Sequence, residues 1–132
     1  PNALLPAEEA KGLTLESKAV RNRLVNEHLA NAIKSKPAPL YHSSFAQRIT
    51  TGNTTDDIAR IADVDWIIEV VVERLDIKKL VFEQIDKYRR PGTLVSSNTS
   101  GIPIALMSEG RSADFQEHFC GTHFFNPARY LK

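Results

Sequence analysis

Residues 65–72, which read DWIIEVVV, restrict the fold of this chain more than any other segment. Six of the eight residues are apolar, and most of those six are β-branched. Successive side chains of a strand point to opposite faces of the sheet. A strand whose odd and even positions are both apolar must therefore be buried on both faces. The segment therefore predicts a central strand of a parallel sheet, although periodicity alone leaves a buried helix open.

Helical and extended segments alternate after this run. Residues 75–88 have the apolar repeat of an amphipathic helix, 93–97 and 120–125 predict two more strands, and 102–107 predict a short helix beginning at Pro103. The predicted buried stripe of the 75–88 helix is Ile77, Leu80, Val81 and Ile85. Its predicted water-facing side is Asp76, Lys78, Lys79 and Glu83. The alternation predicts an α/β fold in which right-handed crossovers place the strands in one parallel sheet with helices on its faces.

The first 64 residues contain weaker signals. A loop is predicted over residues 1–11, followed by an amphipathic helix over 15–34 that Thr14 caps. Residues 48–51 are a candidate short strand. A short helix is predicted through Ile58 and Ile61, with Asp56 and Asp57 as its N-cap and first-turn residues.

Charge and apolar content exclude several classes of partner. The chain has 17 basic and 16 acidic residues, so no electrostatic surface for nucleic acid or an anionic membrane is predicted. No stretch approaches the ~20 apolar residues of a membrane span. Cys120 is the only cysteine, so no intrachain disulfide can form, which is typical of a reducing cytoplasm. His28, His42 and His118 have no cysteine or carboxylate at metal-ligand spacing, so we expect no metal site.

Polar side chains follow each of the three predicted strands. Glu73 comes after the first strand, Asn98-Thr99-Ser100 after the second, and His123 and Asn126 stand at the third. The carboxyl ends of parallel strands meet at one edge of a sheet, where open α/β folds bind their ligands. An imidazole suits proton transfer near neutral pH, and the Ser100 hydroxyl and the Asn126 amide could hold a substrate oxygen.

Each of these residues also has a purely structural explanation. Glu73 could begin the following helix, residues 96–100 could form a capping turn, and His123 could be a hydrogen-bonded core residue. A core histidine has no need to face a polar loop, so the shared edge favours the functional interpretation.

Four sequence blocks carry a resemblance to a known family. They are Glu69-Val70-Val71-Val72-Glu73, then Lys78, then Ser97-Asn98-Thr99-Ser100, then Gly121-Thr122-His123-Phe124-Phe125-Asn126-Pro127. From about residue 49 to residue 132 the chain resembles the 3-hydroxyacyl-CoA dehydrogenases of fatty-acid β-oxidation, and residues 1–48 fit the helical excursion of that family. The ending HFFNPARYLK is similar to bacterial fusion-type members that carry an enoyl-CoA hydratase region.

The resemblance implies a role for each candidate residue. His123 matches the catalytic base that takes the proton of the 3-hydroxyl while hydride passes to the nicotinamide of NAD. Ser100 matches a serine that binds the same oxygen near the nicotinamide, and Asn126 matches an asparagine that fixes substrate and cofactor. Glu73 and Lys78 match positions that contact the nicotinamide-ribose side of NAD.

The resemblance also implies that parts of the family's structure lie outside these 132 residues. The six glycines never approach the G-x-G-x-x-G spacing, so the loop that binds the pyrophosphate would precede residue 1. The glutamate that pairs with the catalytic histidine would fall just after Lys132, and the C-terminal helical domain that makes the dimer is absent. We expect an incomplete Rossmann-type parallel sheet with flanking helices, its first βαβ unit missing, over residues 1–132 with 12–47 as the helical excursion.

The expected molecule is a fragment of a cytoplasmic, homo-oligomeric enzyme that oxidises (S)-3-hydroxyacyl-CoA to 3-oxoacyl-CoA with NAD. The fragment alone is expected to be inactive, and its 65–72 strand is expected to expose an unpaired edge. Two alternatives remain open. One is another NAD(P)-dependent β-hydroxyacid dehydrogenase, and the other is a non-catalytic nucleotide-binding or structural relative of the same fold.

Overall fold

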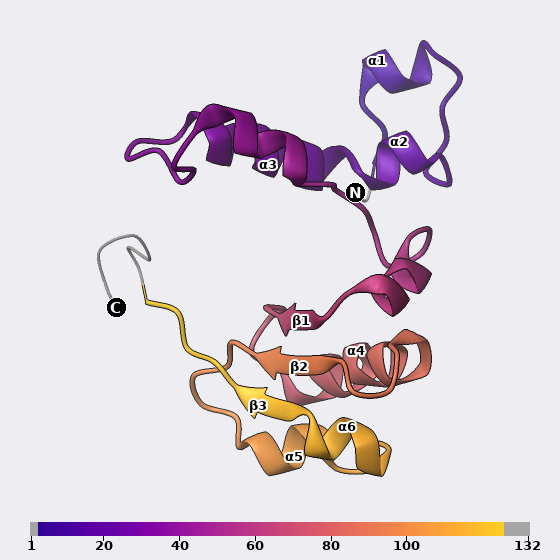
Figure 1. Cartoon of the computed structure of the whole chain (residues 1–132). Helices are drawn as coiled ribbons and strands as arrows, with labels where there is room; N and C mark the ends of the chain where they lie inside the picture. Colours follow the sequence, from indigo (N-terminus) through magenta and orange to yellow (C-terminus); the bar gives the residue numbers. More distant parts are fainter. Residues whose placement is uncertain (1–2, 126–132) are drawn as a thin grey trace. The chain divides into compact units, whose positions relative to one another are not determined.

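The structure, a computed structural model, describes residues 3–125. The chain divides into two compact units, residues 1–57 and residues 58–132. The first unit is helical, and the second contains a three-stranded sheet (Figure 1).

The sheet of the second unit is parallel and has the strand order β1-β2-β3. Its strands are β1 (Trp66–Glu69), β2 (Leu94–Ser97) and β3 (Phe119–Gly121). The register pairs Glu69 with Ser97 and Ser97 with Gly121, so all three strands end at one level of the sheet. The predicted α/β fold with a parallel sheet is confirmed.

Three helices connect these strands. α4 (Leu75–Tyr88) joins β1 to β2, while α5 (Ile104–Ser108) and α6 (Ala113–Glu117) lie between β2 and β3 (Figure 1). Strands that follow one another in the sheet through crossovers of one hand place their connections on one face. The described helices of this unit accordingly share a single core on one face of the sheet, not on both faces as predicted.

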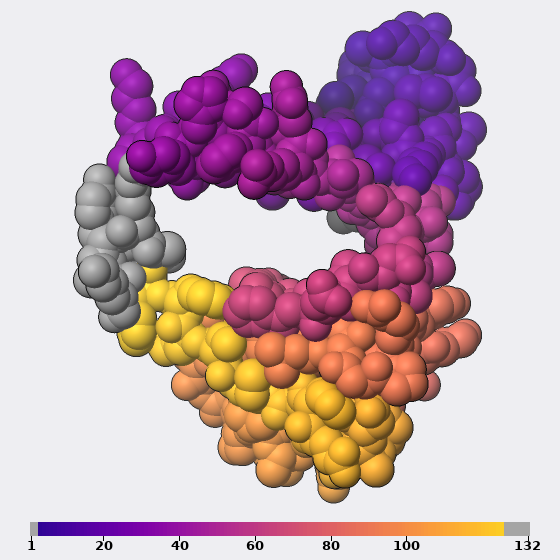
Figure 2. All heavy atoms as spheres, in the orientation of Figure 1, coloured from indigo at the N-terminus to yellow at the C-terminus, as the bar shows by residue number. Residues whose placement is uncertain are grey.

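The core of the second unit is built on aromatic packing. The ring of Phe82 meets Phe115 and Phe119 edge-on, with centroids 5.7 Å and 5.0 Å away. Ile85, Val95 and Met107 complete the buried cluster, which therefore joins α4, α5, α6 and the sheet. The space-filling view shows the orange and yellow atoms of this unit in continuous contact (Figure 2).

The helix predicted over residues 75–88 is confirmed with the same bounds, as α4, but its buried face differs from the prediction. Ile85 is buried as predicted, whereas the prediction is wrong for Leu80, which is 64% exposed. The prediction is also wrong for Lys78, which is 1% exposed. The large ring of Phe82 turns toward the sheet, and residues four before and three after it share that face of the helix.

The strands are shorter than predicted because β2, their common neighbour, ends at Ser97. β1 ends at Glu69 instead of residue 72, and β3 ends at Gly121 instead of residue 125. Beyond these points side chains replace strand partners. The N–H of Val71 donates to the Glu69 carboxylate, and the N–H of Phe124 donates to the side chain of a residue after β2.

Two short helices are not predicted by apolar periodicity, because four or five residues are too few for a repeat. α1 (Pro6–Glu9) replaces the predicted loop over residues 1–11 and begins with a proline, which suits a first helical turn. α6 begins after Ser112, whose hydroxyl accepts from the N–H of Phe115 at 3.1 Å.

The prediction of one continuous helix over residues 15–34 is wrong, because the helix is interrupted at Asn22. The break separates α2 (Lys18–Arg21) from α3 (Arg23–Lys34), and Ser17 rather than Thr14 precedes the first turn. The Asn22 side chain accepts a 2.6 Å hydrogen bond from Asn53, a partner 31 residues away. A polar side chain with such a partner competes with continuous helical hydrogen bonding.

The strand predicted over residues 48–51 does not form. η1 (Ser43–Arg48) is a 3-10 helix, and Ile49 after it has extended backbone angles. The hydroxyl of Thr51 donates to Asn26 at 2.6 Å. A strand requires a neighbour, and no described residue pairs with this segment as one. The short helix predicted through Ile58 and Ile61 is present as η2 (Ile58–Asp63), another 3-10 helix, which begins after Asp56 and Asp57.

The sheet face opposite the helices carries large apolar side chains in the second unit. Trp66, Ile68 and Leu94 on this face are exposed. Among residues 3–125, no helix has the length and apolar character needed to cross a membrane.

The aromatic core generates a stability prediction. Phe82→Ala should lower the free energy of unfolding by about 3–5 kcal/mol, because the removed ring leaves a cavity between α4 and α6. Leu80→Ala on the same helix is the control and should change it by no more than about 0.5 kcal/mol, because Leu80 is exposed. Urea unfolding of the printed chain measures both. Equal losses would contradict the assigned orientation of α4.

The free side of β1 generates a prediction about association. β1 pairs with β2 only, among the described residues, so the backbone groups on its other side lack strand partners. The printed chain should therefore self-associate as its concentration rises, and Ile68→Lys should weaken association by adding an edge charge. Gel filtration over a concentration series is the measurement. A chain that stays monomeric throughout would refute the prediction.

Candidate active site

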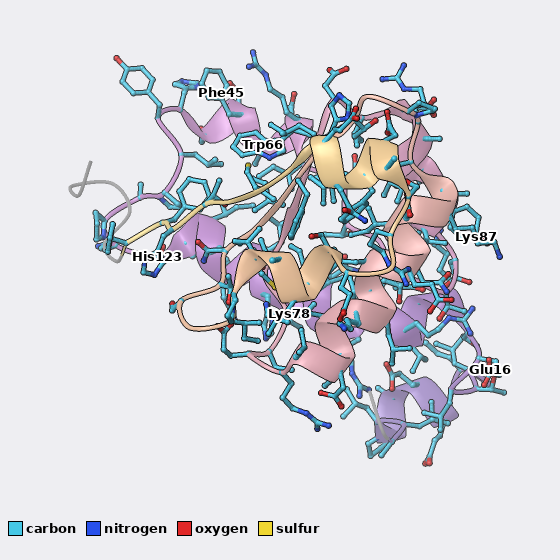
Figure 3. The ribbon with its side chains drawn as sticks, turned by 90° about the horizontal axis from the view of Figure 1, so that it is seen from below. Glu16, Phe45, Trp66, Lys78, Lys87 and His123 are labelled. Atoms are coloured by element: carbon cyan, nitrogen blue, oxygen red, sulfur yellow. The ribbon has the colours of Figure 1, made fainter. Side chains whose placement is uncertain are left out.

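Ser100 and His123 face each other beyond the carboxyl ends of β2 and β3. Ser100 Oγ and His123 Nε2 lie 3.0 Å apart, at hydrogen-bond distance, and both residues are exposed. Figure 3 shows His123 at the end of the segment that leaves β3. The seryl hydroxyl donates to Nε2 when that nitrogen carries no proton and accepts from it otherwise. The structure thus brings together two of the residues that the strand-end rule predicts at one edge.

Two backbone hydrogen bonds hold the segment that carries His123. The N–H of Thr122 donates to the carbonyl of Ser97 at 3.0 Å, which extends the ladder between β2 and β3. The N–H of Phe124 donates to Oδ1 of Asn98 at 2.8 Å. His123 therefore lies between two anchored neighbours, although the strand itself has ended.

The carboxylate of Glu73 holds the loop that carries Ser100. Its Oε1 accepts from the hydroxyl of Thr99, from the N–H of Ser100 at 3.1 Å and from the N–H of Gly101 at 3.0 Å. The Thr99 hydroxyl and then the Gly101 N–H lower the pKa of Glu73 to about 2. Desolvation opposes them, and Ser100 and Lys78 lower the pKa by smaller amounts. Glu73 is therefore ionised at neutral pH and clamps the loop as an anion.

The ammonium of Lys78 lies between two carboxylates. Its Nζ donates to both oxygens of Glu69, at 2.9 Å and 3.0 Å, and to the carbonyl of Val71 at 3.3 Å. Oε2 of Glu73 is 3.6 Å from the same Nζ. Lys78 is buried, whereas the side chain of Glu73 is 45% exposed. Of these two charges, only that of Glu73 is accessible to solvent at the carboxyl edge of the sheet.

Glu69 is a buried acid that the sequence pattern does not single out. Its carboxylate accepts from the N–H of Val71, from Lys78 and from the hydroxyl of Ser97, so both of its oxygens are hydrogen-bonded. Apart from its place in the first block of the family resemblance, its signal in the sequence is that of a glutamate inside an otherwise apolar strand. Such a residue must have a buried partner, but the sequence does not name it.

A pocket of about 300 Å³ opens beside the Ser100–His123 pair. Its lining comprises Thr99, Ser100, Ile102, Pro103, Ile104, Gly121, Thr122 and His123. Gly121 matters for this shape, because a Cβ there would come within 3.0 Å of the Ile104 side chain. The pocket is therefore apolar on the α5 side and polar at the strand ends.

The remaining predicted site residue, Asn126, lies outside the described residues. Among residues 3–125, no three histidine, cysteine, aspartate or glutamate side chains come together as a metal site. Glu73 is not the first residue of α4 but precedes Arg74, which occupies the N-cap position. Its side chain serves the neighbouring loop instead.

Comparison with known proteins shows the family of the chain. A family model described as the NAD binding domain of 3-hydroxyacyl-CoA dehydrogenase matches residues 9–132. The chain belongs to the 3-hydroxyacyl-CoA dehydrogenase family. Because the match covers nearly all of the chain, it includes both units and every candidate site residue.

Two bacterial relatives support the assignment. A protein of Bacillus subtilis named "Probable 3-hydroxyacyl-CoA dehydrogenase" is 54% identical over all 132 residues, which make up 17% of that relative. A protein of the same name from Deinococcus radiodurans is 43% identical over 119 residues, 90% of this chain and 34% of the relative. The chain thus spans about a sixth to a third of the length of these relatives.

A solved structure supports the fold. The 3-hydroxybutyryl-CoA dehydrogenase of Escherichia coli matches 88% of this chain and 24% of its own, with a TM-score of 0.64 and 28% sequence identity. The sheet of the second unit is therefore a partial Rossmann-type sheet of the family, as expected.

The residues at the edge fit one end of NAD. The exposed Ser100 hydroxyl, His123 imidazole and Glu73 carboxylate supply the donors and acceptors that a nicotinamide and its ribose require. The pyrophosphate loop of a Rossmann fold has the pattern G-x-G-x-x-G, which the printed sequence lacks. The residues described thus fit the nicotinamide side of the cofactor.

The hydrogen bonds that the Glu73 carboxylate accepts from its neighbouring loop predict how stability depends on pH. The pKa of Glu73 in the folded chain is about 2, below its ordinary 4.5, so the unfolded chain takes up this proton first as the pH falls. The stabilisation by Glu73 should therefore be complete above pH 4.5 and be lost between pH 4.5 and about 2. Urea unfolding from pH 7 to pH 2 should show that Glu73→Gln removes this part of the acid sensitivity.

The control is Glu83→Gln, which removes the same charge from an exposed site on α4. It should leave the acid sensitivity close to that of the unaltered chain. If both variants respond to acid in the same way, the clamp does not stabilise the fold.

Proposed function

We propose that this chain is the part of an NAD-dependent dehydrogenase that supplies the catalytic base for oxidising (S)-3-hydroxyacyl-CoA to 3-oxoacyl-CoA. The observation that carries the proposal is the 3.0 Å approach of Ser100 Oγ to His123 Nε2 beside an open pocket. A single substrate oxygen can contact both groups at this spacing. Membership of the family supports the reaction class.

His123 acts as the general base in this proposal. Its Nε2 accepts the proton of the 3-hydroxyl as the carbonyl forms, and the Ser100 hydroxyl donates to the same oxygen and fixes its position. Bound NAD supplies the hydride acceptor. Removing the proton in step with hydride loss avoids a cationic oxygen, so the placement of Nε2 determines the rate.

Glu73, Lys78 and Asn126 complete the proposed site. Glu73 offers its exposed oxygen to the ribose beside the nicotinamide, while Lys78 supports that carboxylate from the interior. Asn126 is proposed to fix substrate and cofactor together. Ser100 is also proposed to lie against the nicotinamide, because its loop is held at the cofactor edge of the sheet.

The setting of the enzyme follows from the same proposal. We propose an acyl-CoA substrate, a homo-oligomeric full-length protein, a cytoplasmic location, and no nucleic-acid or membrane partner. The near-neutral charge and the single, unpaired Cys120 support this setting. We further infer that residues 12–47 are a helical excursion from one NAD-binding domain.

The test uses the full-length protein that carries this chain, with (S)-3-hydroxybutyryl-CoA and NAD and with NADH absorbance as the readout. His123→Gln should lower kcat by about 10²–10⁴-fold, because it removes the base, and NADH binding should be retained. Ser100→Ala should lower kcat by about tenfold, because it removes one hydrogen bond to the reacting oxygen. The printed chain alone should show no turnover above the enzyme-free rate.

The matched control is His118→Gln. His118 binds the carbonyl of Asp114 through Nδ1, at 2.8 Å, within the helical part of the unit. Its replacement should leave kcat within about twofold. Full activity in His123→Gln would reject the proposal, and retained NADH binding without activity in the unaltered protein would favour the non-catalytic alternative.

A further inference from the structure

Glu69 and Lys78 form a buried ion pair at the end of β1. Both side chains are 1% exposed, and Nζ of Lys78 contacts both carboxylate oxygens of Glu69. A buried pair of this kind contributes little to stability compared with apolar residues of the same volume, because desolvation offsets the attraction. Apolar residues fill most of the surrounding strand, so stability alone does not account for these charges.

One route leads from Glu69 to His123. The hydroxyl of Ser97 donates to Oε2 of Glu69, and the carbonyl of Ser97 accepts from the N–H of Thr122. Thr122 immediately precedes His123. The carboxylate therefore fixes the last residue of β2, which in turn fixes the backbone that presents the imidazole.

A second route leads from Glu69 to Ser100. Lys78 lies between the carboxylates of Glu69 and Glu73, with the second 3.6 Å from Nζ. Glu73 holds the N–H groups of Ser100 and Gly101. The contacts of Lys78 to Glu69 therefore fix the position of the ammonium. The ammonium in turn restricts the position of the Glu73 carboxylate, which binds the loop that carries Ser100.

We propose that Glu69 is a positioning residue that sets the approach of Ser100 Oγ to His123 Nε2 through these two routes. Glu69 touches neither of the two residues and acts through Ser97 and Lys78. The inference rests on the proposed dehydrogenase activity for its kinetic consequence. The claim that Glu69 positions the Ser100–His123 hydrogen bond does not depend on that activity.

The opposite end of α4 provides a matched control. Arg89 is a buried cation between two carboxylates, Asp86 and Asp114, as Lys78 is between Glu69 and Glu73. Asp86 also accepts from the hydroxyl of Ser112 at 2.7 Å and from its N–H at 2.8 Å. Asp86→Asn therefore removes a comparable charge and comparable hydrogen bonds far from the strand ends.

The experiment compares Glu69→Gln with Asp86→Asn in the full-length protein. Both variants should unfold at lower temperature, because each leaves a buried cation with one carboxylate fewer. Only Glu69→Gln should lower kcat, by about 10- to 100-fold, because misplacing the base and the hydroxyl weakens the reacting geometry. KM for NAD should rise by a smaller factor than kcat falls in Glu69→Gln, because Glu69 reaches the proposed ribose contact of Glu73 only through Lys78. The inference is overturned if kcat stays within twofold of the unaltered protein, or if Asp86→Asn loses as much.

Ser97→Ala keeps the inference testable if Glu69→Gln fails to fold. This variant removes one hydroxyl and leaves the ion pair intact. It should lower kcat by about 3- to 10-fold, because one of the two routes is cut. An unchanged kcat in Ser97→Ala would overturn the route through Thr122 and, with Glu69→Gln unfolded, the inference.

A second readout separates this inference from the proposed function. The ¹⁵N resonance of His123 Nε2 reports the hydrogen bond to Ser100, and Ser100→Ala shows the shift expected when that bond is lost. Glu69→Gln should shift the resonance in the same direction, and Asp86→Asn should not. If the unaltered protein oxidises no 3-hydroxyacyl-CoA, the proposed function fails, and the resonance alone decides the inference. An unmoved signal in Glu69→Gln would refute it.

Discussion

The three parallel strands of the second unit end at one level, because the register pairs Glu69 with Ser97 and Ser97 with Gly121. Every functional feature depends on that alignment. A loop that leaves β2 and a segment that leaves β3 begin side by side, so a hydroxyl and an imidazole 23 residues apart meet at 3.0 Å. A shift of β3 by one residue would turn each side chain to the other face and separate Ser100 from His123.

Three charged side chains at this edge of the sheet follow one another from the interior to the surface. The carboxylate of Glu69 holds the ammonium of Lys78, and that ammonium lies beside the carboxylate of Glu73. Only the last of the three reaches water. The outer carboxylate accepts from the Thr99 hydroxyl and the Gly101 N–H, which lower its pKa most, so it holds the loop around Ser100 and remains ionised at any physiological pH.

Local pattern and chain direction predicted much of this architecture. The bounds of α4 and the parallel order of the strands follow from periodicity and from crossover geometry, and the meeting of Ser100 with His123 follows from the strand-end rule. Tertiary partners account for what could not be predicted. The break at Asn22 depends on a residue 31 positions away, and the burial of Lys78 depends on an acid in a neighbouring strand.

The exposed face of the sheet has an optical consequence. Trp66 is the only tryptophan of the chain, it lies on that face, and its indole N–H donates to Ser96 Oγ at 3.0 Å. The same oxygen accepts from the hydroxyl of Thr122, one residue before the imidazole. The unit therefore contains a built-in fluorophore. Any surface that covers this side of the sheet removes water from the indole and shifts its emission toward the blue.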